Sequence, residues 1–218
     1  MIGRARWQLA TPRAIHWTMR PVSSAKTTSQ TLEDGRLELR IEHAALEGVT
    51  PKMLHWWFQT ASQDMQWRGR TIPRYQLWHP IDHIQLTVVQ RSRDGSVGAG
   101  SKFHIVEAFG GNLDYLLDQV VDIARLDEGG ITLEVRALGK TVMQLAHTFE
   151  EKNGATLYHT RMLLGAVDGL LKPLSHVIRK RRFPPAKAGA WLQHNVEEVG
   201  NFPYFLPELY ARCGGKLE

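Results

Sequence analysis

The stretch WLQHNVEEVGNFPYFLP, residues 191–207, predicts a helix that packs against a core along one side. Each helical residue turns about 100°, so residues four positions apart lie one above the other. His194 and Glu198 have this spacing and lie at the edge of an apolar arc, while Glu197 points with Gln193 toward water. We expect the helix to end soon after this pair. The arc consists of Trp191, Leu192, Val196 and Val199.

The His194–Glu198 pair has two interpretations. Surface helices often carry an ordinary pair of ionisable side chains at this spacing. The alternative is half of a metal site, because histidine nitrogen and carboxylate oxygen both bind zinc. A metal ion needs further ligands, so the second interpretation requires that other parts of the chain supply them.

The composition is typical of a globular protein with one sizeable core. The chain has 218 residues, of which 43% are hydrophobic and 22% are charged. A single cysteine, Cys213, excludes a disulfide within the chain and a zinc site built from cysteines, whereas ten histidines can supply ligands. No apolar run approaches the ~20 residues of a membrane helix. We therefore expect a cytoplasmic protein without a membrane partner.

Basic residues are concentrated in two places, although the net charge is only +5. Residues 1–30 carry five of them before the first acid, Glu33, and we expect a basic, flexible tail that resembles a transit peptide in composition or serves as an arm. Residues 179–182 read RKRR, which suits either a nucleic acid or, more commonly, a solvated helix end. We expect no nucleic-acid partner. The basic residues of the tail are Arg4, Arg6, Arg13, Arg20 and Lys26.

The middle of the chain reads as short strands separated by turns. One helix is predicted to begin at Thr50, which can cap it, with Pro51 in the first turn. Residues 113–126 fit either a short helix or an edge strand. The other strands are predicted at residues 36–46, 84–89, 101–109, 131–137, 141–150 and 155–165.

This order of elements predicts a single α+β domain over residues 31–218. The C-terminal third is predicted to be helical, with breaks at Pro173 and at residues 184–185. A curved antiparallel sheet would wrap around the long C-terminal helix and leave a cavity between them. A ligand site is the default expectation for such a cavity.

Further candidate ligands lie on the predicted strands. In KFHIVEAF, residues 102–109, Glu107 shares a face with apolar side chains, because the side-chain period of a strand is two. A buried carboxylate must be neutralised, hydrogen-bonded or bound to a metal, and a buried ion pair with an arginine is the alternative. WHPIDHI, residues 78–84, offers His79 and His83, and spacing does not choose between them. His147 falls in an apolar row as a core residue or as a catalytic group.

Four motifs together resemble the phloretin hydrolase and diacetylphloroglucinol hydrolase family. They are GVTPKMLHWWF, RYQLWHPIDH, HIVEAFGG and HNVEEVGNFPYFLP, within residues 46–207. The resemblance implies a helix-grip fold (Bet v 1-like or START-like) and hydrolysis of the carbon–carbon bond between an acyl group and a polyhydroxylated aromatic ring. It also implies one zinc ion held by two histidines and two glutamates.

When the family's motifs are matched to this sequence, the resemblance implies four metal ligands: His83, Glu107, His194 and Glu198. The resemblance assigns the catalytic roles to Tyr75 before the first histidine and to His147 with Tyr158, although His159 competes with His147. It implies a small aromatic, polyphenol-like substrate and a homodimer. By this resemblance we expect the chain to lack much of the N-terminal segment that helps form the family's dimer, which leaves the oligomeric state open. Aromatic walls for the substrate ring are expected from Trp56, Trp57, Phe103 and Trp191.

Two other functions compete with this one. A helix-grip protein can bind aromatic or apolar ligands without catalysis. A zinc site of this kind could also hydrolyse an ester or amide, or act in polyketide cyclisation. Histidine and carboxylate ligands suit iron or manganese as well as zinc, so the metal is left open.

Overall fold

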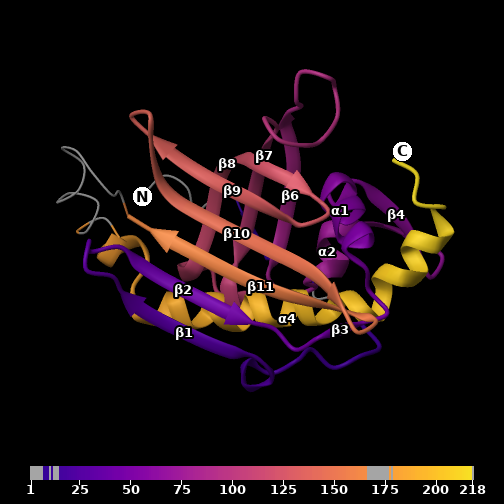
Figure 1. Cartoon of the computed structure of the whole chain (residues 1–218), viewed down its shortest axis with the longest axis horizontal. Helices are drawn as coiled ribbons and strands as arrows, with labels where there is room; N and C mark the ends of the chain where they lie inside the picture. Colours follow the sequence, from indigo (N-terminus) through magenta and orange to yellow (C-terminus); the bar gives the residue numbers. More distant parts are fainter. Residues whose placement is uncertain (1–6, 10, 12–14, 166–176, 178, 218) are drawn as a thin grey trace.

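The fold is a curved antiparallel sheet wrapped around one long helix, as expected for a helix-grip protein (Figure 1). The computed structural model describes residues 7–9, 11, 15–165, 177 and 179–217. The main sheet has nine strands in the order β1-β2-β11-β10-β9-β8-β7-β6, with β3 paired to β11. The strands of this sheet are β1 (Lys26–Thr31), β2 (Leu37–Glu42), β3 (Leu46–Glu47), β6 (His83–Gln90), β7 (Lys102–Ala108), β8 (Leu116–Asp127), β9 (Gly130–Ala137), β10 (Lys140–Lys152) and β11 (Ala155–Leu164).

The helices lie on the concave side and at one end of this sheet. Helix α1 (Pro51–Thr60) begins as predicted, because the Thr50 side chain accepts a hydrogen bond from the Met53 amide. A small hairpin of β4 (Asp64–Trp67) and β5 (Arg70–Pro73) leads into the short helix α2 (Arg74–Trp78). Short 3-10 turns lie at η2 (Val22–Ser24), η3 (Phe109–Gly111) and η4 (Leu113–Tyr115).

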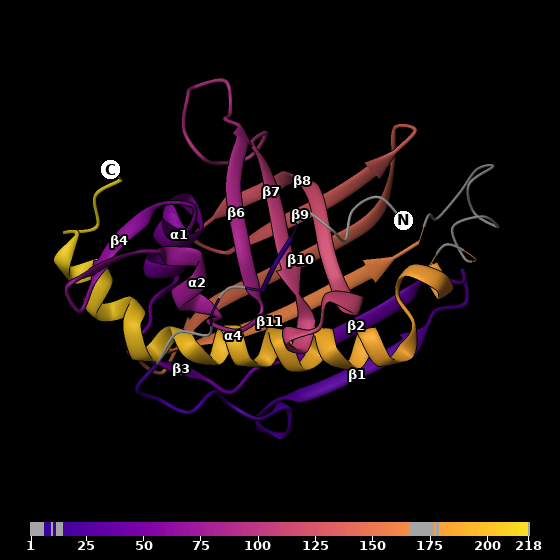
Figure 2. The same ribbon diagram turned by 180° about the vertical axis from the view of Figure 1, so that it is seen from behind.

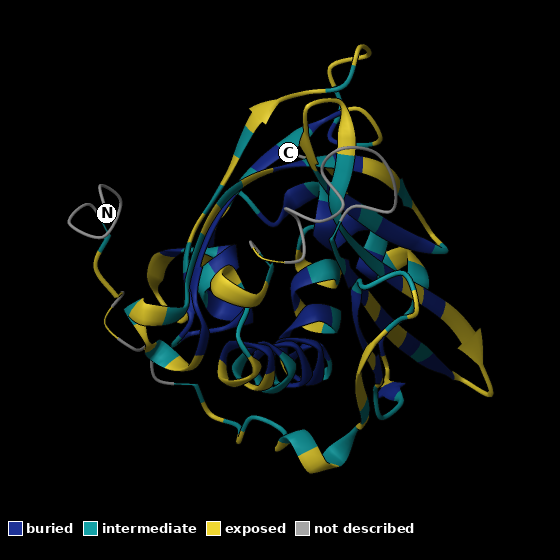
Figure 3. Cartoon of the chain, turned by 90° about the vertical axis from the view of Figure 1, so that its left-hand side faces the viewer, coloured by how far each residue is buried: buried dark blue, intermediate teal, exposed yellow. Residues whose placement is uncertain are grey.

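Helix α4 (Pro185–Arg212) lies inside the curve of the sheet, and its buried side faces the strands (Figures 2 and 3). The expected end of the helix soon after Glu198 is wrong, since Pro203 and Pro207 both lie within it. Each proline lacks the N–H that would bond one turn back, which favours a bend. Figure 1 shows α4 bending toward α1 near its C-terminal end. The predicted break at Pro173 lies outside the described residues.

Two other elements differ from the sequence-based predictions. Residues 113–126 were expected to form a short helix or an edge strand, but most of them belong to β8, which pairs with both β7 and β9. Residues 26–30 were expected in a flexible tail, but they belong to β1, which pairs with β2. Trp17 of the same segment stacks on Tyr204 of α4, with ring centroids 5.5 Å apart. The tail therefore joins the fold from Trp17 onward wherever the structure describes it.

Candidate metal centre

A large cavity of about 930 Å³ lies between the sheet and α4. Its size is near the upper end of the usual range for small-molecule sites. Most of its wall is apolar, as in a ligand pocket. The polar side chains at one end of this cavity include Tyr75, Glu107, His147, His194 and Glu198.

The four ligands implied by the sequence motifs come together at that end. His83 Nε2 lies 3.5 Å from Glu107 Oε1 and 3.4 Å from Glu198 Oε2. His194 Nε2 lies 3.7 Å from Glu107 Oε2 and 3.8 Å from Glu198 Oε2. All four residues are buried. Strand pairing accounts for the first contact, because His83 on β6 is the direct partner of Glu107 on β7.

The tautomer of His83 follows from its hydrogen bond. Its Nδ1 lies 2.7 Å from the backbone carbonyl oxygen of Tyr75, so Nδ1 carries the proton and donates it. The lone pair is then on Nε2, which is buried and has no hydrogen-bond partner among the described residues. The Tyr75 ring lies flat on the imidazole at a centroid distance of 3.8 Å and fixes its orientation. Such an orphaned nitrogen is a suitable metal ligand.

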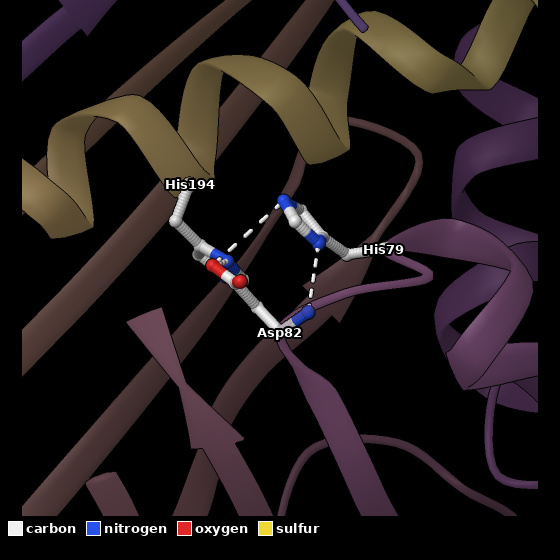
Figure 4. A group of neighbouring side chains, drawn as sticks. All are labelled: His79, Asp82 and His194. Atoms are coloured by element: carbon white, nitrogen blue, oxygen red, sulfur yellow. Dashed lines mark hydrogen bonds and ion pairs between the residues drawn. The ribbon is translucent and has the colours of Figure 1, made fainter. Parts of the chain in front are cut away.

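His194 is oriented by Asp82 in the same way. Its Nδ1 lies 2.9 Å from Asp82 Oδ2 (Figure 4), and its Nε2 faces the two glutamates. Asp82 also accepts hydrogen bonds from the amides of Gly110 and Gly111, each 2.8 Å long. Both glycines have positive φ, 67° and 62°, which turns their amides toward the carboxylate. The motifs PIDH and AFGG thus meet at Asp82, which our sequence analysis did not assign a role.

His79 extends this network to Glu197. His79 Nδ1 accepts a hydrogen bond from the Asp82 amide, so its Nε2 carries the proton and donates to Glu197 Oε2 at 3.0 Å. The His79 ring also stacks on His194 with centroids 4.7 Å apart (Figure 4). The expectation that Glu197 points to water is wrong, because its side chain is 18% exposed and bonded to His79. The contacts of His79 therefore help to hold Asp82 and His194 in place.

Each glutamate has one hydrogen-bond donor of its own. The Tyr75 hydroxyl donates to Glu107 Oε1. The side-chain amide of Asn195 donates to Glu198 Oε1, which leaves Glu198 Oε2 toward both histidines. Asn195 was also missed in the sequence, because an asparagine inside a helix gives no signal until its neighbours are known.

The spacing and charge of the cluster fit a divalent cation. Tetrahedral zinc with ligands at 2.0–2.1 Å separates adjacent ligand atoms by about 3.4 Å, close to the 3.4 and 3.8 Å between Glu198 Oε2 and the two histidine nitrogens. Ligand atoms of His83, His194 and Glu198 lie within 4.8 Å of one another. Asp82 adds a third carboxylate to the two glutamates.

The pKa values reflect this excess of negative charge. Burial raises the pKa of Glu198 to about 8, with the charge of Glu107 acting in the same direction. Burial opposes protonation of His194, but Glu198, Asp82 and Glu107 together raise its pKa to about 9. Burial alone would raise the pKa of Asp82, but the hydrogen bond and charge of His194, then the charge of His79 and the hydrogen bond from Gly110, lower it overall. A bound cation would neutralise the carboxylates, so that neither Glu198 nor His194 would need to hold an extra proton.

The residues assigned to catalysis differ in their access to the cavity. Tyr75 and His147 line it. His159, the competitor of His147, is exposed on the other face of β11. Burial lowers the pKa of His147 to about 3, so its ring is neutral, and its Nδ1 lies 3.0 Å from Thr160 Oγ1. Tyr158 is fully buried next to His147 and is absent from the cavity lining, and its hydroxyl has no partner among the described residues.

The aromatic walls are partly those expected. Phe103 and Trp191 line the cavity, together with Phe58 and Trp78. Trp56 and Trp57 are buried in the core instead and do not line the cavity.

The second basic run lies at the same cavity. Residues 179–182 are helical, and three of their four arginine and lysine side chains line the cavity. None of the described helices is long and apolar enough to cross a membrane.

Comparison with solved structures finds likenesses of low identity. Ginseng major latex-like protein 151 from Panax ginseng is 12% identical, covers 72% of this chain and 97% of its own, and has a TM-score of 0.42. Ara h 8.0201 is 10% identical, covers 74% and 96%, and has a TM-score of 0.37. A Rhodobacter sphaeroides protein is 11% identical, covers 84% and 99%, and has a TM-score of 0.46. At these values the likenesses do not bear on activity.

Comparison of the sequence with protein families is more specific. No curated protein matches the chain. The profile of the family described as the DAPG hydrolase PhiG domain matches residues 25–211, a range that contains the whole sheet, the cavity and all four residues of the cluster. The protein therefore belongs to the DAPG (diacetylphloroglucinol) hydrolase PhiG domain family, to which its sequence motifs pointed.

Proposed function

We propose that this hydrolase-family protein uses one zinc ion to cleave the carbon–carbon bond between an acyl group and a polyhydroxylated aromatic ring. The observation that carries the proposal is the buried group of two imidazole Nε2 atoms and two carboxylates at the polar end of a large apolar cavity. His83, Glu107, His194 and Glu198 would hold the ion. When bound, zinc lowers the pKa of a coordinated water to about 7 and polarises a carbonyl group.

The reaction consumes one water. The bond from the acyl carbon to the ring carbon breaks, the acyl carbon gains a hydroxyl group, and the ring carbon gains a proton. The products are a carboxylic acid and the deacylated phenol. Ring hydroxyls are essential, because they let the ring leave as a stabilised enolate or phenolate and not as an aryl carbanion.

The protein's own residues would orient the phenol and move its protons. Neutral His147 can exchange a proton with a ring hydroxyl or ring carbon, and Thr160 fixes its ring through Nδ1. Tyr75 can donate to a ring hydroxyl whenever Glu107 shifts. The walls formed by Phe103 and Trp191 suit a planar ring and exclude water. Tyr158 would act behind His147, because it does not line the cavity.

A set of four protein ligands usually marks a closed structural zinc site. Catalysis therefore requires that one carboxylate moves or that a fifth ligand position opens. Glu107 would be the carboxylate that moves, because its two oxygens face different histidines, Oε1 at 3.5 Å from His83 and Oε2 at 3.7 Å from His194. Glu198 would keep its place, because its Oε2 faces both histidines.

The test combines metal content with products. The purified protein should contain about one zinc ion per chain, and it should release the free acid and the deacylated ring from acylphloroglucinols but not from phenyl esters, as measured by product mass. Glu198→Gln should lose at least 100-fold in turnover, whereas Glu208→Gln, an exposed glutamate of the same helix, should not change it.

Other outcomes select the competing functions. Cleavage of phenyl esters alone would indicate an ester hydrolase. Tight ligand binding without stoichiometric metal, and unchanged in His194→Ala, would indicate a non-catalytic binding protein. Full turnover in Glu198→Gln would overturn the proposed site.

A further inference from the structure

One face of α4 connects the metal centre to a lysine at the far end of the cavity. Lys187, Trp191, His194 and Glu198 all line the cavity, and their spacing of four, three and four residues places them on one side of the helix. Seven residues of α-helix rise roughly 10 Å. Lys187 therefore lies about that far along the helix from His194, inside the same cavity.

Lys187 is a buried cation without a carboxylate partner. It is 8% exposed, and among the described residues no ion pair joins it to an aspartate or glutamate. Its Nζ donates one hydrogen bond, to the Leu116 carbonyl oxygen at 2.8 Å. An ammonium group has three N–H donors, so two are left for another acceptor. Burying a charge in this way is costly unless it is paired.

The position of Lys187 on α4 makes burial of its positive charge still less favourable. Helix α4 begins at Pro185 and has no side-chain cap, so the positive end of the helix dipole lies next to Lys187. Arg182 is close enough to act on it as well. Burial and then the charge of Arg182 lower the pKa of Lys187 to about 8. Helix end, lysine and arginine all favour an anion at this place.

The space between Lys187 and His194 is apolar. The Phe109 ring lies 5.7 Å from Lys187 Nζ, and its centroid is 5.0 Å from that of His194. Asp114 and Asp118 also line the cavity, but both are exposed, and Asp118 accepts hydrogen bonds from Trp7 and His104. A ligand that spans the two ends would therefore need an apolar middle and an acidic end.

We propose that Lys187, assisted by Arg182, binds a carboxylate at the free end of the substrate's acyl arm. The substrates would be ω-carboxyacyl phenols, whose ketone lies at the metal centre and whose acid reaches the start of α4. The identity of the phenol rests on the proposed function, but the anion site does not. Lys187 would set specificity and take no part in bond cleavage.

Binding to metal-free protein tests this site without turnover. The ligands are a short series of ω-carboxyacyl phloroglucinols of different arm length, each compared with its neutral methyl ester by calorimetry. The native protein should bind the best-fitting acid at least tenfold more tightly than its ester, as expected for a charge-assisted hydrogen bond. Lys187→Met should lose this preference and keep the affinity for the ester within about twofold. Lys180→Met removes an exposed lysine of the same segment that does not line the cavity, and it should keep the preference.

The outcomes separate the two proposals. Equal affinity for acid and ester in the native protein, or a preference that persists in Lys187→Met, would overturn the anion site. Should Lys187→Met not fold, Lys187→Gln is measured in the same way. If the acid is preferred but no zinc-loaded protein cleaves it, the anion site stands and the proposed hydrolysis fails.

Discussion

At the scale of single residues, Asp82 orients His194, one of the four residues proposed to hold the ion. It holds His194 Nδ1 and two backbone amides, and it lies one residue before His83. An asparagine oxygen at this position could still accept from His194 and Gly110, but its NH2 group would face the Gly111 amide and the charge would be lost.

We therefore expect Asp82→Asn to weaken zinc binding by about 10–100-fold, the usual effect of losing a carboxylate that orients a ligating histidine. Competition with a chromogenic chelator measures the affinity. Asp122→Asn, which breaks a partly exposed pair with Lys102 on β7 and β8, is the matched control and should bind zinc normally. An Asp82→Asn protein with native affinity would show that His194 does not need this support.

The sequence predicted the four residues of the cluster better than it predicted the residues that hold them in place. Glu107 stood out because a carboxylate fell in an apolar strand row, and His194 and Glu198 because of their helical spacing. The choice of His83 over His79 needed the family motif, since the turn between Pro80 and the strand hides which ring points inward. Asp82, Asn195 and Glu197 were missed, because their partners lie on other elements and no local pattern reports them.

At the scale of elements, strands were easier to predict than their places in the sheet. Alternation located most of the strands of the main sheet, but it did not show that β8 lies between two neighbours, because pairing is decided by contacts far along the chain. The β4–β5 hairpin and α2 were not predicted, since segments of four or five residues are too short for periodicity. The C-terminal helix was expected to end soon after Glu198, but burial of its apolar face keeps α4 intact through Pro203 and Pro207.

Glu38 holds three strands together and gives a pH-dependent contribution to stability. Its carboxylate on β2 is buried and binds Arg40, Gln30 of β1 and Arg161 of β11. The hydrogen bond from Arg40 is the largest of the effects that lower its pKa from 4.5 to about 2. A lowered pKa contributes stability that is fully present above pH 4.5 and is lost as the pH falls toward 2.

We expect Glu38→Gln to reduce the free energy of unfolding at pH 7 by about 2 kcal/mol, a value below the full pKa shift because both arginines are about half exposed to solvent. The difference from the native protein should shrink as urea unfolding is repeated between pH 7 and 3. Glu42→Gln, an exposed partner of Lys26, should show little loss at any pH. A loss that does not change with pH would mean that Glu38 acts through packing alone.

At the scale of the whole molecule, the N-terminal segment closes the outer side of α4. Trp17 stacks on Tyr204, and its Nε1 donates to Asn201 Oδ1 at 2.8 Å. Asn201 in turn donates to the Trp78 carbonyl oxygen at the end of α2. The basic composition of this segment suggested a flexible tail, because composition alone does not show that Trp17 packs on α4.

Removing this ring should loosen the whole fold. We expect Trp17→Ala to lower the free energy of unfolding by about 2 kcal/mol, less than the 3–5 kcal/mol of a fully buried tryptophan because Trp17 is half-buried. Trp7→Ala removes a half-buried ring that donates to Asp118 and whose ring contact within the described part of the chain is with His104 and not with α4, and it should cost less than half as much. Thermal unfolding by circular dichroism compares the two. Equal losses would mean that the N-terminal segment does not depend on Trp17.

The residues that meet at the candidate metal centre lie far apart in the sequence, which links metal binding to folding. Asp82 and His194 are 112 residues apart in sequence, and closing so long a loop is entropically unfavourable in a denatured chain. With zinc bound as proposed, only the native state would offer the assembled ligands, and occupancy would raise the folded population by mass action. Cells starved of zinc would then contain less of this protein, because proteases remove the unfolded fraction. The protein would not simply accumulate in an inactive form.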